Sequence, residues 1–147
     1  MGRVGASLEI PWTPEQAFKV ASRIDLLPAW FPEVAEASLL DSPLGVGSRI
    51  RMKLGPGGAG TEVVGTVREL HPPTLVAIAG SGGPLRIEVR TKLQPVPSGC
   101  RIATEVHVAA PPLLGFVGRE AERRIATELP AALERLRDLI AAEAAPE

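Results

Sequence analysis

Apolar and polar residues alternate along several stretches of the chain, which is the pattern of strands that bury one face. Every second residue is apolar from residue 4 to residue 10, and the same period of two recurs over residues 50–54, 85–93 and 102–108. Clusters of Gly, Pro, Ser and Asp separate the strand-like stretches between residues 33 and 110. Strands joined by short turns predict an antiparallel meander with one apolar and one polar face.

Two short helices are predicted between the first strand and the meander. Thr13, Pro14 and Gln16 have the pattern of a capping box with proline at the first helical position, so a helix should begin at Pro14. Asp25 is expected to cap a second short helix that Pro32 closes.

The last part of the chain predicts one long amphipathic helix. After Pro111 and Pro112, apolar residues recur at helical spacing over about 25 residues. These residues are Phe116, Val117, Ala121, Ile125, Leu129, Leu133, Leu136 and Ile140. Pro130 lies within this segment and lacks the N–H that would bond to the carbonyl of Ala126, so we expect a kink there. The order of elements predicts an α+β domain in which the long helix covers the apolar face of the sheet.

Composition excludes several classes of function. The 147 residues carry 16 Lys and Arg against 17 Asp and Glu, spread evenly, so the basic cluster of a nucleic-acid-binding protein is missing. No apolar run approaches the roughly 18 residues that span a bilayer, and the first residues lack the apolar core of a signal peptide. We therefore expect a single cytoplasmic domain over residues 1–147, with no nucleic-acid partner and no integral membrane association.

The side chains that most often bind metals are scarce. The chain has one cysteine, Cys100, and two histidines, His71 and His107. A single cysteine excludes an internal disulfide and a multi-cysteine metal site. His71 precedes Pro72 in a predicted connection and is interpreted as a loop residue. We expect no metal and no cofactor.

The hairpin that contains His107 can be given a register. We predict a turn at Pro97 and Ser98 with these residues opposite one another: Thr91 and Thr104, Arg90 and Glu105, and Glu88 and His107. This register sets two complementary charge pairs on the outer face, each contributing a few tenths of a kcal/mol. His107 is therefore interpreted as a surface residue rather than a catalytic one.

The glycine-rich segment from Gly55 to Gly60 is not expected to be a phosphate loop. It is followed by Thr61 and Glu62 instead of Lys and Ser or Thr, and it joins two strands instead of preceding a helix. It is interpreted as a hairpin tip, and whether it lies at the mouth of a cavity or acts as a lid is left open.

Several short segments of the chain are similar to those of a known superfamily. They are IPWTPEQAF from residue 10, DLLPAWFPEV from residue 25, GVGSR from residue 45, ELHPPTLV from residue 69 and SGCRI from residue 98. With the order of elements, they resemble the SRPBCC superfamily of START, polyketide cyclase/dehydrase and birch-pollen-allergen-like proteins. The resemblance covers essentially the whole chain and implies the helix-grip fold: a seven-stranded curved antiparallel sheet wrapped around a long C-terminal helix, with two short helices between strands 1 and 2.

The resemblance implies a deep, mostly apolar cavity between the sheet and the long helix. Members bind lipids, sterols, polyketides or quinones, and a minority catalyse reactions in the cavity. From the apolar phase of each element, the expected lining is Ile50, Met52, Leu54, Ile87, Val89, Val106, Phe116, Ile125 and Leu129, with Thr91 and Thr104 as polar positions. Trp30 and Phe31 are interpreted as core residues of the short helices, and direct contact with a ligand is the alternative.

Three functions remain open. The leading hypothesis is a carrier or binder of a small hydrophobic molecule. The second is a polyketide cyclase, aromatase or dehydratase that acts in the same cavity, although the chain has no tyrosine and no histidine that we place inside, so we assign no catalytic residue. The third is a protein-interaction module with a filled core. A homodimer is also left open.

Overall fold

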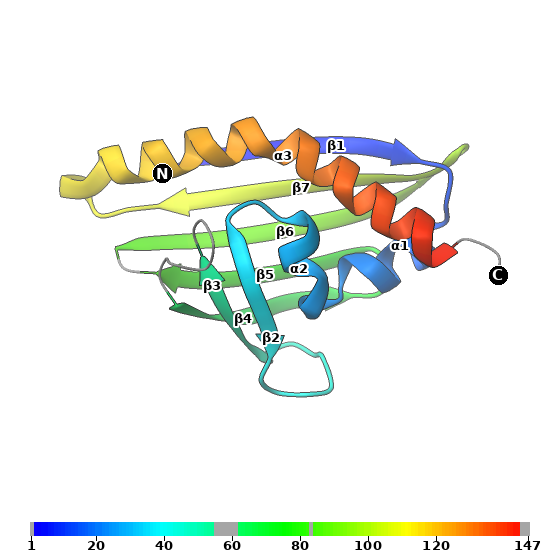
Figure 1. Cartoon of the computed structure of the whole chain (residues 1–147), viewed down its shortest axis with the longest axis horizontal. Coiled ribbons are helices and arrows are strands. Elements are labelled where there is room, and N and C mark those ends of the chain that lie inside the picture. The colour runs from blue at the N-terminus through cyan, green and yellow to red at the C-terminus, as the bar shows by residue number, and fades with distance from the viewer. Residues whose placement is uncertain (1, 55–61, 83, 145–147) are drawn as a thin grey trace.

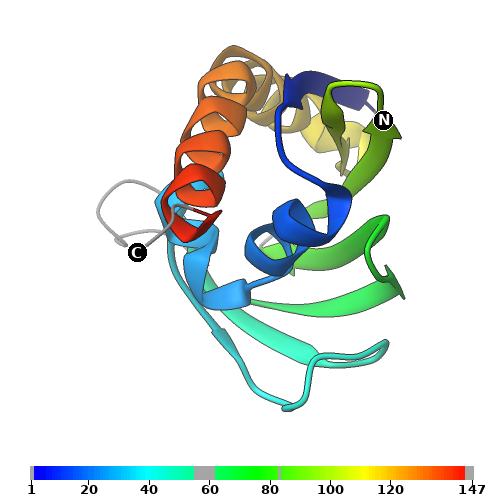
Figure 2. The ribbon, with the colours of Figure 1, turned by 90° about the vertical axis from the view of Figure 1, so that its right-hand side faces the viewer.

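Seven antiparallel strands form one curved sheet in residues 2–54, 62–82 and 84–144, which are the residues that the computed structural model describes. The strands are β1 (Gly2–Ile10), β2 (Val34–Leu39), β3 (Arg49–Leu54), β4 (Glu62–His71), β5 (Leu75–Gly82), β6 (Leu85–Val96) and β7 (Gly99–Ala109). They pair in the order β1-β7-β6-β5-β4-β3-β2. Figure 1 shows the strands side by side, and Figure 2 shows how they curve around the helices. The predicted α+β fold, a curved sheet wrapped around a long C-terminal helix, is confirmed.

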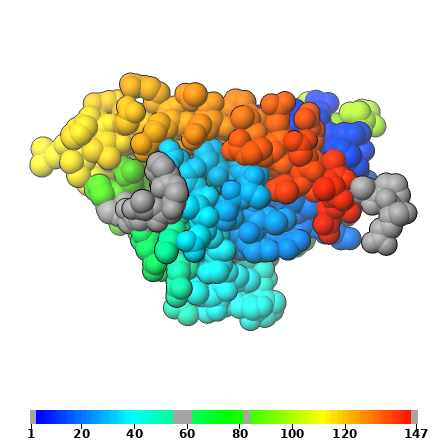
Figure 3. All heavy atoms as spheres, in the orientation of Figure 1, coloured from blue at the N-terminus to red at the C-terminus, as the bar shows by residue number. Residues whose placement is uncertain are grey.

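Helices cover the inner face of the sheet. They are α1 (Pro14–Ala21), the 3-10 helix η1 (Ile24–Leu26), α2 (Leu27–Trp30), the 3-10 helix η3 (Pro112–Leu114) and α3 (Gly115–Ala144). The long helix α3 runs beside β1 and contacts β7, α1 and α2 (Figure 1). The atoms of α2 abut those of α3 in the space-filling view (Figure 3). No helix of the described residues is both long and apolar enough to cross a membrane.

The first short helix begins as predicted. The backbone N–H of Gln16 donates to the side chain of Thr13 at 3.2 Å, and the Gln16 side chain accepts from the Thr13 N–H at 3.0 Å. These two bonds satisfy donors that the first turn of a helix leaves free. The sequence therefore determines this helix start locally.

The prediction that Asp25 caps the second short helix is wrong. Asp25 lies inside η1, and its carboxylate accepts a hydrogen bond from the guanidinium of Arg23 at 2.7 Å. The following helix, α2, has Leu26 at its N-cap and no side-chain cap. An Asp and an Arg two residues apart can pair directly, and this contact replaces the cap.

The predicted register of the β6–β7 hairpin is confirmed at each of its three pairs. Thr91 lies opposite Thr104, Arg90 opposite Glu105 and Glu88 opposite His107. The two threonine hydroxyls are buried and lie 3.1 Å apart, so one donates to the other.

The charges on the outer face pair differently from the prediction. Arg90 contacts Glu69 on β4 and approaches Glu88 of its own strand at 3.8 Å, while His107 approaches Glu105 of its own strand at 3.9 Å. Between β6 and β4 the residue that faces Arg90 is Ala77, whose side chain is too small to block the long guanidinium. Arg90 therefore spans one strand and reaches a carboxylate two strands away.

The tightly packed core lies where α3 meets α1 and the first strand. Its largest fully buried side chains include Ile10, Leu93, Ile102, Leu129, Leu133, Leu136 and Ile140, and Val20 of α1 belongs to the same cluster. Burying side chains of this size stabilises a fold by about 1.5–3 kcal/mol each. This end of the interior is filled.

Pro130 does not end α3. The helix continues from Gly115 to Ala144 with Pro130 inside it, and it changes direction near its middle (Figure 1). Proline removes one backbone donor and its ring pushes on the preceding turn, which accounts for the bend. The predicted kink is present, and the side chain of Pro130 faces solvent.

Candidate ligand pocket

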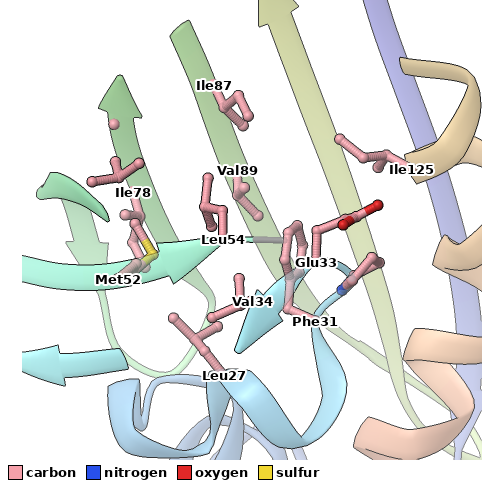
Figure 4. A pocket seen from close by; sticks show the side chains of 13 residues that line it. Leu27, Phe31, Glu33, Val34, Met52, Leu54, Ile78, Ile87, Val89 and Ile125 are labelled. Carbon is pink, nitrogen blue, oxygen red and sulfur yellow. The ribbon is translucent and has the colours of Figure 1, made fainter. Parts of the chain in front are cut away.

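An apolar pocket lies between the inner face of the sheet and the segment from α2 to β2, beside α3 (Figure 4). The sheet contributes Met52, Leu54, Val63, Ile78, Gly80, Ile87 and Val89. The opposite wall consists of Leu27, Phe31, Pro32, Glu33, Val34 and Ile125. These residues come from β3, β4, β5, β6, the α2–β2 segment and α3, so the curvature of the sheet creates the space.

The pocket is small and almost entirely apolar. Its volume is about 90 Å³, whereas pockets that enclose a drug-sized ligand measure roughly 300–1,000 Å³. Met52 and Phe31 are among its walls, and the unbranched side chain of methionine adapts readily to a new shape. A ligand larger than a few atoms must therefore displace side chains on entry.

Five of the residues expected in the cavity line this pocket. They are Met52, Leu54, Ile87, Val89 and Ile125. Ile50, Thr91, Thr104, Val106 and Leu129 are buried but do not line it. The alternation of apolar residues identifies the inner face of each strand. It does not predict which inward-facing residues pack in the core and which line the pocket.

The expectation that Phe116 faces the interior is wrong. Its side chain is 62% exposed, while Gly118, Ala121 and Ile125 of the same helix are buried. Phe116 precedes Gly118 by two residues, which rotates it by about 200° around the helix axis. It therefore points away from the sheet.

The two threonines expected in the cavity do not line the pocket. Thr91 and Thr104 bond to one another, and both side chains are buried. A buried hydroxyl pair of this kind supports the pairing of β6 with β7, and neither threonine lines the pocket. Their role is structural.

The wall formed by the α2–β2 segment is the part of the pocket that sequence reasoning missed. Phe31 belongs to the buried core, as the sequence predicts, and it also lines the pocket, as do Leu27 and Val34. Trp30 is the residue of this segment that is fully enclosed, and its ring packs edge-on against Phe31. Apolar residues on both sides of Pro32 are a signal that this segment faces the interior.

Glu33 is the one ionisable residue in the described lining of the pocket. Its backbone has φ of 67°, which makes it the one described non-glycine residue in the left-handed region. Its carboxylate lies 3.4 Å from Nε of Arg124 on α3, and its side chain is 26% exposed. Nothing in the pattern of the sequence marks this residue.

The remaining candidates for chemistry lie elsewhere. His71 is exposed and approaches Glu69 at 3.9 Å, and Glu69 contacts Arg90, whose hydrogen bond lowers the pKa of Glu69. Cys100 is fully enclosed, and burial raises the pKa of its thiol, which makes it a poor nucleophile. Within the described residues, no three His, Cys, Asp or Glu side chains come close enough to hold a metal ion. The segment from Gly55 to Gly60 lies outside the described residues.

Comparison with known families agrees with this geometry. The model of the family described as "Polyketide cyclase / dehydrase and lipid transport" matches residues 1–141. The chain belongs to this family. The family and the fold together place it in the SRPBCC superfamily, as the sequence predicted.

Individual relatives are more distant. A toxin of Mycobacterium tuberculosis (Rv0910) is 26% identical over an alignment of 129 positions, and the alignment covers 80% of this chain and 83% of the toxin. The crystal structure of TTHA0849 from Thermus thermophilus has a TM-score of 0.78 at 18% identity and covers 98% of this chain and 100% of that one. The di-domain ARO/CYC protein StfQ of the steffimycin biosynthetic pathway has a TM-score of 0.77 at 13% identity, over 97% of this chain and 51% of StfQ. The two structural likenesses show the fold.

The family and the apolar pocket support a role in binding a hydrophobic molecule or in cyclising one. The chemistry available in the pocket is limited. Its walls can bury the apolar surface of a ligand and hold it by van der Waals contact, and the one carboxylate, that of Glu33, lies at the rim.

Proposed function

We propose that the chain binds and carries a small hydrophobic molecule in the pocket between the sheet, the α2–β2 segment and α3. The observation that carries this proposal is the lining, in which twelve of thirteen described residues are uncharged and nearly all are apolar. A water-exposed apolar hollow is unfavourable by itself, and an apolar ligand removes that surface from water.

The composition of the lining supports carriage more than cyclisation. Cyclisation of a polyketide needs placed groups that move protons at the reacting carbons. In the described lining, Glu33 is the one side chain that could take a proton, and Arg124 already holds its carboxylate at the rim. The described lining contains no second acid or base that could act together with Glu33.

Entry of the ligand must enlarge the pocket. A volume of about 90 Å³ holds only a fragment of a lipid or an aromatic polyketide. The wall opposite the sheet is a four-residue helix and the turn that follows it. We propose that this wall and the Met52 side chain move outward when the ligand binds, while the packed end near α1 stays fixed.

The test uses an apolar fluorescent probe, N-phenyl-1-naphthylamine, titrated into three proteins. Val89 lines the pocket from β6, so Val89→Phe should fill the space and weaken binding at least tenfold. Val64 is 51% exposed on the outer face, so Val64→Phe is the same substitution away from the pocket and should leave binding unchanged. Equal binding by the wild type and Val89→Phe would contradict the proposal.

A broader panel guards against an unsuitable probe. Fatty acids, sterols, quinones and aromatic polyketides are each added to the wild type in a thermal unfolding experiment. A ligand at a hundredfold excess over its dissociation constant should stabilise the protein by about 2.7 kcal/mol. If no member of the panel raises the melting temperature, the carrier hypothesis is wrong.

A further inference from the structure

We propose that Glu33 selects the polar end of the bound molecule, so that the pocket favours an amphipathic ligand that ends in a hydroxyl or an amine over one that ends in a carboxylate. This inference rests on the proposed function and adds the chemical class of the ligand. It concerns a single side chain at the rim of an otherwise uncharged pocket.

The position of Glu33 places a carboxylate where the end of a ligand would lie. Glu33 follows Pro32 at the junction of α2 and β2, and its stem forms part of the pocket wall. In Figure 4 its carboxylate points toward α3, on the side of the pocket where Ile125 lies. A molecule whose apolar body contacts Leu54 and Val89 can thus present its polar end to Glu33 at the rim.

The backbone of Glu33 indicates that the side chain has a use. A φ of 67° is unfavourable for a residue with a Cβ, and glycine adopts it without strain. Strained backbone of this kind concentrates at functional sites, where the surrounding structure maintains it. The chain holds a glutamate here although glycine would suit the backbone better.

The ion pair with Arg124 defines what the rim accepts. The side chain of Glu33 is 26% exposed and that of Arg124 is 57% exposed, so the carboxylate is the inner member and the guanidinium the outer one. Arg124 already neutralises one negative charge. A carboxylate accepts hydrogen bonds and cannot donate them.

Two kinds of ligand end therefore meet different surroundings. A hydroxyl or an ammonium group can donate to Glu33 while Arg124 keeps its contact. A second carboxylate would add an unpaired negative charge beside Glu33, at a place partly removed from water where like charges repel strongly. Repulsion of the wrong ligand is a common source of specificity.

The experiment compares octylamine, octanoate and 1-octanol as competitors of N-phenyl-1-naphthylamine. The three share one apolar chain, and the measured quantity is the ratio of octylamine affinity to octanoate affinity. In the wild type the ratio should exceed ten. In Glu33→Gln it should fall at least tenfold, because the negative charge is gone, while 1-octanol should bind about as well as before.

Two arginine variants complete the comparison. Arg124→Gln leaves Glu33 unneutralised, so the ratio should rise above that of the wild type. Arg123 is the neighbouring arginine, bonded to Glu120 at 3.2 Å and outside the lining, so Arg123→Gln should leave the ratio unchanged. An unchanged ratio in Glu33→Gln, or equal shifts in both arginine variants, would overturn the proposal.

A glycine variant separates selection from structure. Glu33→Gly removes the carboxylate and relieves the backbone, so its melting temperature should be no lower than that of the wild type while the ratio falls as in Glu33→Gln. A glycine variant that unfolds earlier and keeps the wild-type ratio would mean that Glu33 is only structural. Failure of all three octyl compounds and the probe to bind the wild type, together with no stabilisation by any member of the ligand panel, would instead refute the proposed function itself.

Discussion

Single residues account for some of the stability of this fold and for much of what the sequence could not predict. The pattern of the hairpin predicts that Thr91 and Thr104 lie opposite one another, and the structure shows that their hydroxyls bond at 3.1 Å. Glu33 escapes such prediction, because its importance depends on a backbone angle and on a neighbour 91 positions away in the chain. The hydrophobic period of the sequence predicts which face of an element is buried. It does not predict a contact between two residues far apart in the chain.

The threonine pair gives a prediction for stability. Thr91→Val should destabilise the protein by about 1–3 kcal/mol, because the Thr104 hydroxyl is then buried without a partner. The double variant Thr91→Val/Thr104→Val should recover most of the loss, because neither position then has an unsatisfied polar group. Denaturant unfolding of the wild type, both single variants and the double variant measures this cycle. A double variant that loses the sum of the two single losses would show that the pair is not coupled.

A second prediction concerns acid. Hydrogen bonds from the side chain and backbone N–H of Arg49 lower the pKa of Asp41 to about 2, from an ordinary value near 3.8. A carboxyl whose pKa is lower in the folded protein stabilises it above the unfolded pKa, and this contribution disappears as the pH falls from about 4 to about 2. Asp41→Asn should therefore lower the melting temperature at pH 7 and weaken its dependence on pH in that window.

The control for the acid prediction is Asp138→Asn. Asp138 contacts the adjacent Arg137 on α3, so this ion pair lies within one helix and does not link α3 to another element. The melting temperature of the Asp138→Asn variant at pH 7 should match that of the wild type, and its change between pH 4 and pH 2 should follow the wild-type profile. Parallel pH profiles of Asp41→Asn and the wild type between pH 4 and pH 2 would refute the role of the Asp41–Arg49 pair.

At the scale of elements, local sequence signals predicted where the helices and strands lie. They did not predict which side of a helix each residue occupies. The capping box at Thr13 determines the start of α1, and alternation identifies the inner face of β3, β6 and β7. The long helix is predicted correctly, but Phe116 is assigned to the wrong side of it. The first turn of a helix has too few residues to fix its phase, and the packing of Gly118 and Ala121 determines it instead.

The bend in α3 supports a prediction about exchange. Leu133, Leu136 and Ile140 beyond the bend are fully buried and hold the end of the helix, whereas Ile125 before it faces the pocket. We predict that the bend lets the first half of α3 shift while the second half stays in place. Pro130→Ala restores the missing backbone donor, so it should straighten and stabilise the helix and slow the release of the fluorescent probe.

Stopped-flow displacement of the probe measures the release rate, and far-ultraviolet circular dichroism together with thermal unfolding reports on the helix. Ala131→Gly serves as a reference, because it changes the adjacent exposed position without restoring a donor. An unchanged release rate in a Pro130→Ala protein that is straighter and more stable would mean that the bend only fits α3 to the curvature of the sheet.

At the scale of the whole molecule, the interior is divided into a filled end and an open end. Side chains of α1, the second half of α3 and the strands β1, β6 and β7 pack the filled end. The open end lies under the α2–β2 segment. Sequence pattern and resemblance predicted the fold class and a cavity, but the division depends on how far the sheet curves, which is a property of the complete structure.

The most direct test of this account is to find where an apolar molecule lies when it binds. Nuclear Overhauser contacts between N-phenyl-1-naphthylamine and the methyl groups of the isotope-labelled protein give that position. We predict contacts to Leu54, Val89 and Ile125 in the pocket, and none to Leu133 in the filled end. Contacts confined to exposed methyl groups, such as those of Val64 on the outer face or Leu113 before α3, would contradict the central claim that the pocket is the binding site.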